Sequence, residues 1–515
     1  MKKRFLPIIL AVVSAAATLF GGCDGEKGGT IPPAPDYSAS TLQYNFYGYS
    51  AAIDGWNIDG ISYSSGNDYK TVERIKEYKD AGMTIYFPQS AAAFNGNTPF
   101  EESETKRVMD NSLEAGIDKV ILMDPRIQSL SKPAKENAVG LIGEGKQFAT
   151  EADLDATIAE YMAPYRDHEA FYGVMLGDEP FYYHTENYGQ VYKSIKRVCP
   201  EAYIQYNLNP ITAGTGVNST GERNIDARFP QLVEGDEGYG ATLNSDEELI
   251  ARYRKYLRGF MDATGSDHIQ YDQYPLTRSD LIDSYHILGL QVVAKLAQEY
   301  NAEFYFVTQT YAQTERSPYR KVTQEDLYWL NNMLVGFGIK EISYFTYFTK
   351  ADNNAEHFID GQSFITWNGQ KTKIYDWMQQ IMAEEQKFAP TILNFEYQTS
   401  KVFMKAPTIF DSTHALRTIE TPDFKVLTDV SINKEIALVT ELYDSAKQNY
   451  MYMVQNIVDP LDKGSKSFQT TVLTFSEQYK YAAVYVKGEV TLKKLENGTL
   501  TLKHKPGEAT FVMPY

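Results

Sequence analysis

Two adjacent carboxylates follow an apolar run in Phe171-Tyr-Gly-Val-Met-Leu-Gly-Asp-Glu-Pro180. Proline removes a backbone donor and forces the chain out of a strand. If the run is a strand of an α/β barrel, Asp178 and Glu179 lie at its carboxyl end, where such barrels carry catalytic groups. A second strand end before a proline, in Gln270-Tyr-Asp-Gln-Tyr-Pro275, presents Asp272. Two carboxyl groups placed in this way suit acid–base chemistry.

The other residues expected at strand ends are amides, carboxylates and aromatic rings. Our candidates for substrate binding are Asp54, Trp56, Asp124, Arg126, Asp178, His184, Asn207, Tyr274, Gln309 and Tyr347. Sugars require this mixture, because amides and carboxylates hydrogen-bond hydroxyl groups while ring faces pack against C–H faces. A glycine-rich phosphate loop is absent from the sequence. We therefore expect cleavage of a glycosidic bond, with Glu179 as the proton donor and Asp272 as nucleophile or base.

Structural alternatives exist for several of these residues. The Asp-Glu-Pro sequence also suits the N-terminus of a helix, where acids are favoured. Asp272 could bind the backbone or Arg278, or hold substrate instead of reacting. Trp56 and Trp367 could stack on sugar rings or simply pack. The seven histidines form no pair with metal-ligand spacing, so we expect no metal and no organic cofactor, and His184 is expected to bind sugar or solvent.

Eight short apolar runs alternate with amphipathic segments. The runs are residues 44–53, 83–88, 119–123, 171–176, 203–208, 268–271, 303–308 and 341–348. The helical segments include 68–81, 103–115, 154–165, 188–198, 280–300, 324–336 and 373–386. This alternation indicates parallel pairing, and eight repeats predict a (β/α)8 TIM barrel over residues 42–388. Residues 211–247 are expected to form a long loop over the pocket, the alternative being disorder.

The pattern changes after Pro390, where short alternating runs and tight turns replace long helices. Examples are residues 435–443, 450–455, 482–486 and 509–512, with a turn at Glu496-Asn-Gly498. We therefore expect an all-β sandwich domain over residues 389–515.

The N-terminus carries a targeting signal. Lys2, Lys3 and Arg4 precede an apolar run that ends at Gly21-Gly22-Cys23. We interpret residues 1–22 as a lipoprotein signal peptide, Cys23 as the lipidated residue and 23–41 as a flexible tether. The alternative is ordinary secretion with a chance cysteine. Acidic residues directly after Cys23 favour a lipid anchor in the outer membrane, exposed at the cell surface.

Charge and composition narrow the partners of the 515-residue chain. Its net charge of −18 argues against nucleic acid, because phosphate binding requires basic patches. After Cys23 the sequence holds only one cysteine, Cys199, which we expect to pack as a small hydrophobe. The expected partners are a carbohydrate substrate, a membrane bound through Cys23, and other proteins of glycan uptake.

Several of these motifs resemble glycoside-hydrolase-like barrels of gut Bacteroidota. The resemblance lies in Leu176-Gly-Asp-Glu-Pro180, Tyr271-Asp-Gln-Tyr-Pro275 and Tyr344-Phe-Thr-Tyr347. The segment Asn368-Gly-Gln-Lys-Thr-Lys-Ile-Tyr375 is similar to the end of the barrel in the family 42 β-galactosidase type. This resemblance covers roughly residues 42–515 and implies a barrel hydrolase with a C-terminal sandwich.

The resemblance also exposes a departure. In the clan of family 42 the acid follows the fourth strand, where Glu179 stands, and a nucleophilic glutamate follows the seventh, where this chain has Gln309. An amide cannot attack the anomeric carbon, so Asp272 or Glu315 would have to serve. Carboxylates after strands four and six form the pair in the α-galactosidase type of barrel, with roles exchanged. The alternative is a non-catalytic glycan-binding surface lipoprotein on a degenerate barrel.

Overall fold

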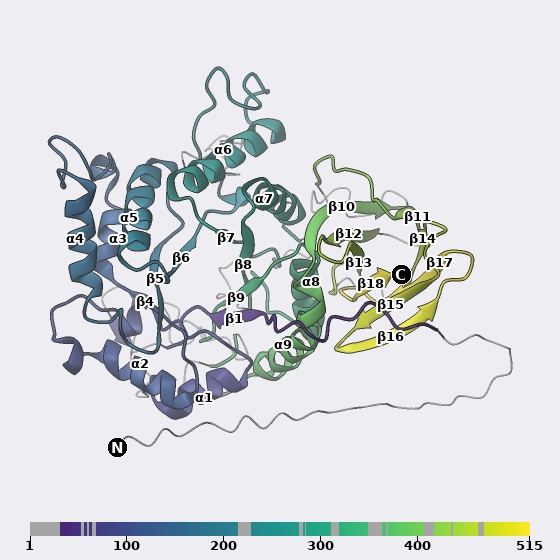
Figure 1. Ribbon diagram of the computed structural model, residues 1–515, viewed down its shortest axis with the longest axis horizontal. Helices are drawn as coiled ribbons and strands as arrows, with labels where there is room; N and C mark the ends of the chain where they lie inside the picture. The colour runs from purple at the N-terminus through teal and green to yellow at the C-terminus, as the bar shows by residue number, and fades with distance from the viewer. Residues whose placement is uncertain are drawn as a thin grey trace.

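The structure is a computed structural model with two parts, an N-terminal part of parallel strands and helices and a C-terminal part of antiparallel sheets (Figure 1). It describes residues 31–52, 68–214, 228–277, 282–283, 285–310, 319–348, 363–366, 369–405, 417–433, 436–461 and 468–515. It also describes the backbone of two short paired strands, β2 (Trp56–Ile58) and β3 (Ile61–Tyr63).

Two parallel sheets make up the first part. One has the order β1-β9-β8-β7 and the other β4-β5-β6. Their strands are β1 (Asn45–Gly48), β4 (Val120–Met123), β5 (Phe171–Asp178), β6 (Tyr203–Asn207), β7 (His268–Asp272), β8 (Glu303–Gln309) and β9 (Glu341–Phe345). These seven strands lie in the runs that the sequence predicts, and the strand–helix alternation is confirmed.

Backbone hydrogen bonds connect the two sheets on both sides. Residues 84–87 form no regular strand, yet Ile85 donates to Phe46 of β1 and Tyr86 donates to Lys119, beside β4. On the other side, the Leu208 N–H donates to Gln270 of β7 over 2.9 Å. The eight predicted apolar runs are therefore all hydrogen-bonded to their neighbours.

Helices cover the parallel strands. They are α1 (Val72–Asp80), α2 (Glu104–Ala115), α3 (Pro125–Ser131), α4 (Glu151–Met162), α5 (Thr185–Val198), α6 (Asp246–Thr264), α7 (His286–Tyr300), α8 (Gln324–Gly336) and α9 (Lys373–Ile392). Helices α3 and α6 are absent from our list of predicted segments. The signal for α6 was present, since Ser245 caps it by accepting from the Glu248 N–H and Gly265 ends it with a φ of 67°. The helix also shortens the expected 211–247 loop, of which residues 215–227 lie outside the described part.

The C-terminal part has one sheet of six strands, in the order β10-β12-β13-β18-β15-β16, and one of three, β11-β14-β17. The strands are β10 (Glu396–Met404), β11 (Leu427–Ile432), β12 (Ile436–Asp444), β13 (Asn449–Asn456), β14 (Gln469–Phe475), β15 (Tyr481–Val486), β16 (Glu489–Lys494), β17 (Thr499–His504) and β18 (Ala509–Pro514). Val439 and Tyr452 of the larger sheet share an apolar core with Leu473 and Leu500 of the smaller. The antiparallel β-structure expected after Pro390 is confirmed.

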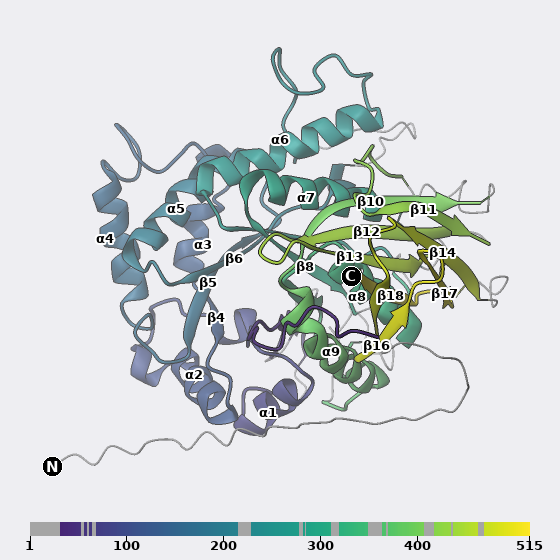
Figure 2. The same cartoon turned by 45° about the vertical axis from the view of Figure 1, so that its right-hand side comes forward.

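The two parts are joined by buried contacts, and α8 and α9 lie between them in both views (Figures 1 and 2). The Arg320 guanidinium donates to Asp459 over 2.7 and 2.8 Å and to Asp326 over 2.6 Å. Trp329 of α8 donates its indole N–H to the Ile457 carbonyl over 3.3 Å. Removing one partner of such a buried ion pair is strongly destabilising. These contacts therefore stabilise the packing of the two parts against each other.

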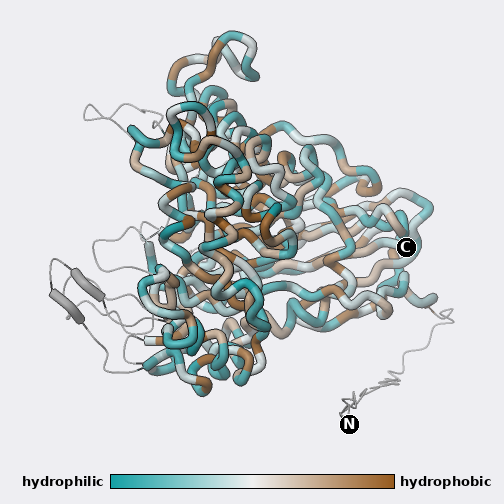
Figure 3. The backbone as a smooth tube through the Cα atoms, turned by 60° about the vertical axis from the view of Figure 1, so that its left-hand side comes forward, coloured by the Kyte–Doolittle hydropathy of each residue, from teal (hydrophilic) through white to brown (hydrophobic). Residues whose placement is uncertain are grey.

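Residues 31–41, the end of the expected tether, lie against the C-terminal sheets. Tyr37 is buried and donates its hydroxyl to Asp444 over 2.7 Å. Figure 3 shows hydrophobic segments concentrated along the strands in the interior, with hydrophilic stretches in many outer turns. None of the helices in the described ranges is long and apolar enough to cross a membrane.

Candidate active site

Alternate residues of the parallel strands point into one shared interior, as strand geometry requires. A single apolar cluster contains side chains of both sheets: Tyr47, Tyr49, Ile85, Phe87, Ile121, Met175 and Val307. The same alternation brings Asn207 of β6 and Asp272 of β7 to the carboxyl end of this interior. Polar groups therefore succeed the apolar cluster at the strand ends, beside Asp178 and Glu179.

Asp178 and Glu179 are held by the neighbouring strand. The Glu179 N–H donates to the Asn207 carbonyl over 2.8 Å, and the Asn207 side-chain amide donates to Asp178 Oδ1 over 3.0 Å. Glu179 has a φ of +43°, a conformation that side chains other than glycine rarely adopt. Strained backbone of this kind concentrates at functional sites. The positive φ of Glu179 takes the backbone out of the strand directly after β5.

Asp272 is buried at the end of β7, with 5% of its surface exposed. Its Oδ1 has no hydrogen-bond partner among the described residues. Burial raises the pKa of Asp272 well above its usual range, and the charges of Glu179 and Asp178 raise it further. The Tyr274 hydroxyl and the Asn207 amide oppose this rise. Burial and the two neighbouring carboxyl groups thus both oppose ionisation of Asp272.

Glu179 differs from Asp272 in its neighbours. Burial and the charge of Asp178 raise the pKa of Glu179, but Arg228 and Lys132 act in the opposite direction. The largest causes of the shift at Asp272 are burial and the charges of Glu179 and Asp178. Cations therefore support the charge of Glu179, whereas burial is the main influence on Asp272.

Aromatic rings form a wall beside these carboxyl groups. Tyr274 stacks on Phe345 with 5.3 Å between ring centroids, and Tyr319 meets Tyr274 edge-on at 5.6 Å. Tyr319 lies close enough to be affected by the charges of Asp272 and Glu179. Tyr49 belongs to the apolar cluster of the interior, and its hydroxyl accepts a hydrogen bond from the Gln205 side chain over 2.6 Å.

The sequence-based list of site residues lacked Tyr49, Gln205, Tyr319, Lys132 and Arg228. Counting alternate residues along the predicted runs 44–53 and 203–208 would have identified Tyr49 and Gln205 as residues that point inward. No local pattern singles out Lys132, Arg228 or Tyr319, because loops from distant parts of the chain bring them to the site.

Two expected site residues, Asp124 and Arg126, bind each other. Arg126 donates to both oxygens of the buried Asp124 over 2.9 and 2.6 Å, and its guanidinium lies 4.5 Å from the Tyr161 ring centroid. The Tyr165 hydroxyl also donates to Asp124 over 3.1 Å. Tyr161 and Tyr165 belong to the outer layer around α4, so this pair points away from the shared interior.

His184 is also held by the backbone. The Phe181 N–H donates to its Nδ1 over 3.0 Å, and its Nε2 lies 2.9 Å from the Pro133 carbonyl, to which it donates. Burial lowers the pKa of His184, consistent with a neutral ring in this arrangement. The side chain therefore ties the turn after Glu179 to the segment before α4 and positions both.

The side chains of Gln309 and Tyr347 are both buried and contact other parts of the protein. The Gln309 side chain accepts from the Leu276 N–H and donates to the Leu276 carbonyl, each over 3.1 Å. It thereby holds the loop after β7 in place. Tyr347 is 1% exposed and packs edge-on against Tyr78, with 4.7 Å between ring centroids.

Some expected residues lie outside the described part of the chain. These are Cys23, Asp54, the Trp56 side chain, Arg278, Glu315 and Trp367. Within the described ranges, no group of three or more His, Cys, Asp or Glu side chains is arranged to hold a metal ion.

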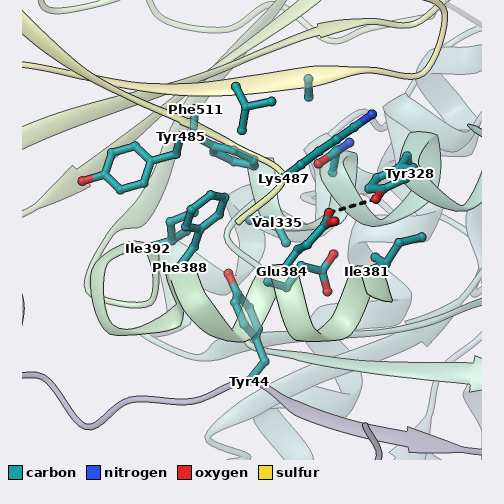
Figure 4. A pocket seen from close by; sticks show the side chains of 14 residues that line it. Tyr44, Tyr328, Val335, Ile381, Glu384, Phe388, Ile392, Tyr485, Lys487 and Phe511 are labelled. Atoms are coloured by element: carbon teal, nitrogen blue, oxygen red, sulfur yellow. Dashed lines mark hydrogen bonds between the residues drawn. The ribbon is translucent and has the colours of Figure 1, made fainter. Parts of the chain in front are cut away.

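Away from the strand ends, a hollow lies between α8, α9 and the six-stranded sheet (Figure 4). Its lining is mostly apolar and includes Ile381, Phe388 and Phe511. Glu384 accepts a hydrogen bond from the Tyr328 hydroxyl over 2.9 Å at its edge. The lining also holds two carboxyl groups, Glu384 and Glu385, and the amide of Asn332, but these are set among apolar side chains. The strand ends combine their carboxyl groups with more amides and hydroxyl groups, so we take them as the candidate site for a sugar.

No model of a protein family matches the sequence, and no curated protein matches it. Among solved structures, the chain is similar to a glucosidase from Croceicoccus marinus, with 10% identity and a TM-score of 0.39 over 93% of this chain and 98% of that one. It is also similar to a family 39 glycoside hydrolase from the gut symbiont Bacteroides cellulosilyticus WH2, with 11% identity and a TM-score of 0.40 over 87% and 78%. An endo-β-1,4-mannanase from Thermotoga petrophila gives 11% and 0.38 over 91% and 99%. TM-scores below 0.5 carry no functional weight, so the function proposed below rests on the site's own residues.

Proposed function

We propose that this protein is a glycoside hydrolase that acts on an extracellular oligo- or polysaccharide through Glu179 and Asp272. The observation that carries the proposal is the pair itself. Glu179 directly follows β5 and Asp272 is the last residue of β7. The two groups are close enough that the charge of Glu179 raises the pKa of Asp272. Glycosidic cleavage requires one protonated and one ionised carboxyl group.

The proposed scaffold is a closed (β/α)8 barrel over residues 42–388, followed by a β-sandwich over residues 389–515. The backbone hydrogen bonds from Ile85 to Phe46, from Tyr86 to Lys119 and from Leu208 to Gln270 support closure. In a closed barrel all strand ends with catalytic groups meet at one mouth. Glu179 and Asp272 would then face a single substrate.

The charges around the pair favour exchanged roles relative to our first expectation. Arg228 and Lys132 support the charge of Glu179, which we assign as nucleophile or base. Burial raises the pKa of Asp272 well above its usual range, and we assign this group as the proton donor. Asn207, Tyr274 and Asp178 would bind sugar hydroxyls, because their polar groups lie beside both carboxyl groups.

Sugar release from a broad glycan panel tests the proposal. The wild type, Glu179→Gln and Asp272→Asn are compared, with Glu160→Gln on the exposed face of α4 as the control. We expect release by the wild type and the control and a loss of about 10²–10⁴-fold in each site variant. Release that survives both substitutions would refute the assignment.

Aryl glycosides with activated leaving groups separate the two roles, because such leaving groups need no protonation. If Asp272 is the acid, Asp272→Asn should retain most of its activity on these substrates while Glu179→Gln does not. The opposite pattern would return the acid role to Glu179.

One observation favours a second candidate function, capture of a glycan without cleavage. Gln309 stands where the resemblance places a nucleophilic glutamate, and it is occupied with the Leu276 backbone. Binding of one glycan by the wild type, undisturbed by Glu179→Gln and without sugar release, would support this function instead.

For location, we propose that Cys23 is acylated after removal of residues 1–22 and anchors the protein to the outer membrane, facing outward. There it would act beside other proteins of glycan uptake. Labelling of cells with a fatty acid analogue tests this. We expect label on the wild type and none on Cys23→Ser.

A further inference from the structure

Three cationic side chains surround the turn that follows Glu179. The Lys132 ammonium contacts the Asp178 carbonyl oxygen. The Arg228 guanidinium lies 5.7 Å from the Phe181 ring centroid, and the Lys135 ammonium lies 5.7 Å from that of Tyr183. We call Lys132, Lys135 and Arg228 the cationic rim. Its charge is opposite to that of the chain as a whole, which is −18.

The rim borders a pair of stacked rings. Phe181 and Tyr183 stack with 5.2 Å between centroids and an angle of 25° between planes, and both rings are half-buried. His184 packs on Tyr183 at 4.3 Å and is itself fixed to the Pro133 carbonyl. The rings and the rim are therefore held in place relative to Glu179, and an exposed ring face suits the C–H face of a sugar.

The lysines of the rim differ from the paired lysines elsewhere in the protein. Lys106 and Lys255 each lie 2.7 Å from an aspartate oxygen. Lys132 and Lys135 are exposed, and neither has a carboxylate within ion-pair distance in the described part of the chain. Their ammonium groups remain available to an anion, which would form charge-assisted hydrogen bonds with them.

We propose that the cationic rim is a subsite for an anionic substituent, a carboxylate or a sulfate. This substituent would be on a sugar unit next to the glycosidic bond that Glu179 and Asp272 cleave. The substrate class is then an acidic glycan. This inference rests on the proposed function of the Glu179–Asp272 site. In an acidic protein a negatively charged polymer is repelled at long range, so a local cluster of cations is what such a substrate requires.

A competing account is that the rim only supports the charge of Glu179. Lys135 separates the two accounts. The cations that lower the pKa of Glu179 are Arg228 and Lys132, whereas Lys135 lies farther along, against Tyr183. A change at Lys135 should therefore affect an anionic ligand while leaving the Glu179 carboxyl group as it is.

The test compares ligands that differ only in charge. Oligogalacturonate is compared with its fully methyl-esterified form, and chondroitin sulfate with its desulfated form reduced at the carboxyl groups. Affinities are measured for the wild type, Lys132→Met, Lys135→Met and a control, Lys193→Met, an exposed lysine on the outer helix α5. We expect the wild type to prefer at least one charged form by about tenfold or more, and this preference to fall with salt.

Each lysine of the rim should lose most of that preference on substitution, while Lys193→Met keeps it and melting temperatures stay unchanged. A preference for the galacturonate identifies a carboxylate subsite, whereas a preference for chondroitin sulfate without one for the galacturonate identifies a sulfate subsite. Equal affinities for charged and neutral forms, or a preference that survives both rim substitutions, would overturn the subsite. Sugar release from neutral glycans that Glu179→Gln abolishes would then leave the hydrolase standing. Charge-dependent binding without release from any glycan would support the subsite and count against catalysis.

Discussion

The two ends of the parallel strands both bury a carboxyl group, but they surround it differently. At the amino end, Glu341 accepts a hydrogen bond from the Tyr203 hydroxyl over 2.7 Å. Tyr203 stacks on His268 with 5.3 Å between ring centroids, and His268 stacks on Tyr305 at 4.8 Å. At the carboxyl end, Asp272 lies beside two further carboxyl groups, Glu179 and Asp178.

A raised pKa alone therefore does not identify a reacting group. Burial raises the pKa of Glu341 to about 8, so this group also holds a proton at neutral pH. Glu341 lies at the amino end of the strands, where Glu303 raises its pKa further and the Tyr203 hydroxyl and Lys119 lower it. Asp272 differs because Glu179 and Asp178 lie beside it, and because Arg228 and Lys132 oppose the rise in the pKa of Glu179, which favours one protonated and one ionised carboxyl group in the same site. Variants at the two ends can break or sharpen this distinction.

The largest effect on activity is expected at the carboxyl end. Glu179→Gln should lower sugar release by about 10²–10⁴-fold, since an amide can neither attack nor take a proton. The variant should be at least as stable as the wild type, because it removes a partly buried charge that lies beside the charge of Asp178. Sugar release and thermal melting measure the two effects.

Glu341→Gln provides the contrast at the amino end, where activity at neutral pH should remain within a few-fold of the wild type. A variant at Glu341 that loses as much activity as Glu179→Gln while remaining folded would remove the distinction between the two ends.

The next effect is on stability at alkaline pH. The folded-state pKa of Glu341, about 8, lies above the value of an unfolded glutamate, so the folded state binds more protons between these values. The contribution of Glu341 to stability is full below about pH 4.5 and is lost as the pH rises through 8. Glu341→Gln should avoid this loss and gain up to about 5 kcal/mol relative to the wild type at pH 9.

Chemical denaturation at pH 5, 7 and 9 measures this gain, with Glu160→Gln as the exposed control. A difference between Glu341→Gln and the wild type that is the same at all three pH values would show that Glu341 does not titrate in this range.

The positions of the strands along the chain could be predicted because each strand is a short apolar run followed by a polar residue. Glu179 and Asp272 were selected as candidate site residues for the same reason. The long-range partners of Asp124, His184 and Gln309 were not predictable, since the Tyr165 hydroxyl and the Pro133 and Leu276 carbonyls come from distant segments. A polar residue at a strand end faces either the interior or the outer helices, and a shift of one residue decides which. Asp124 faces outward for this reason.

Variants of Gln309 test whether this residue at the carboxyl end of the strands stabilises the fold or binds substrate. Its side chain satisfies both backbone groups of the buried Leu276, so Gln309→Leu should cost about 2–4 kcal/mol in the free energy of unfolding. Gln309→Glu should be less damaging at low pH, where a protonated carboxyl group can still donate to the Leu276 carbonyl. Neither variant should gain activity. Unchanged stability with a raised KM would instead assign Gln309 to substrate binding.

The smallest expected effect is a displacement of the pH profile. The charge of Asp178 raises the pKa values of both Glu179 and Asp272. Asp178→Asn removes this charge and can keep the hydrogen bond to Asn207, so both pKa values should fall. If Glu179 must be ionised and Asp272 protonated, the acidic limb of kcat/KM reports Glu179 and the basic limb reports Asp272. Both limbs should then move to lower pH in this variant and stay in place in Glu160→Gln. A basic limb that does not move would show that a group outside this cluster supplies the proton, and the difference between the two ends of the strands would then rest on Glu179 alone.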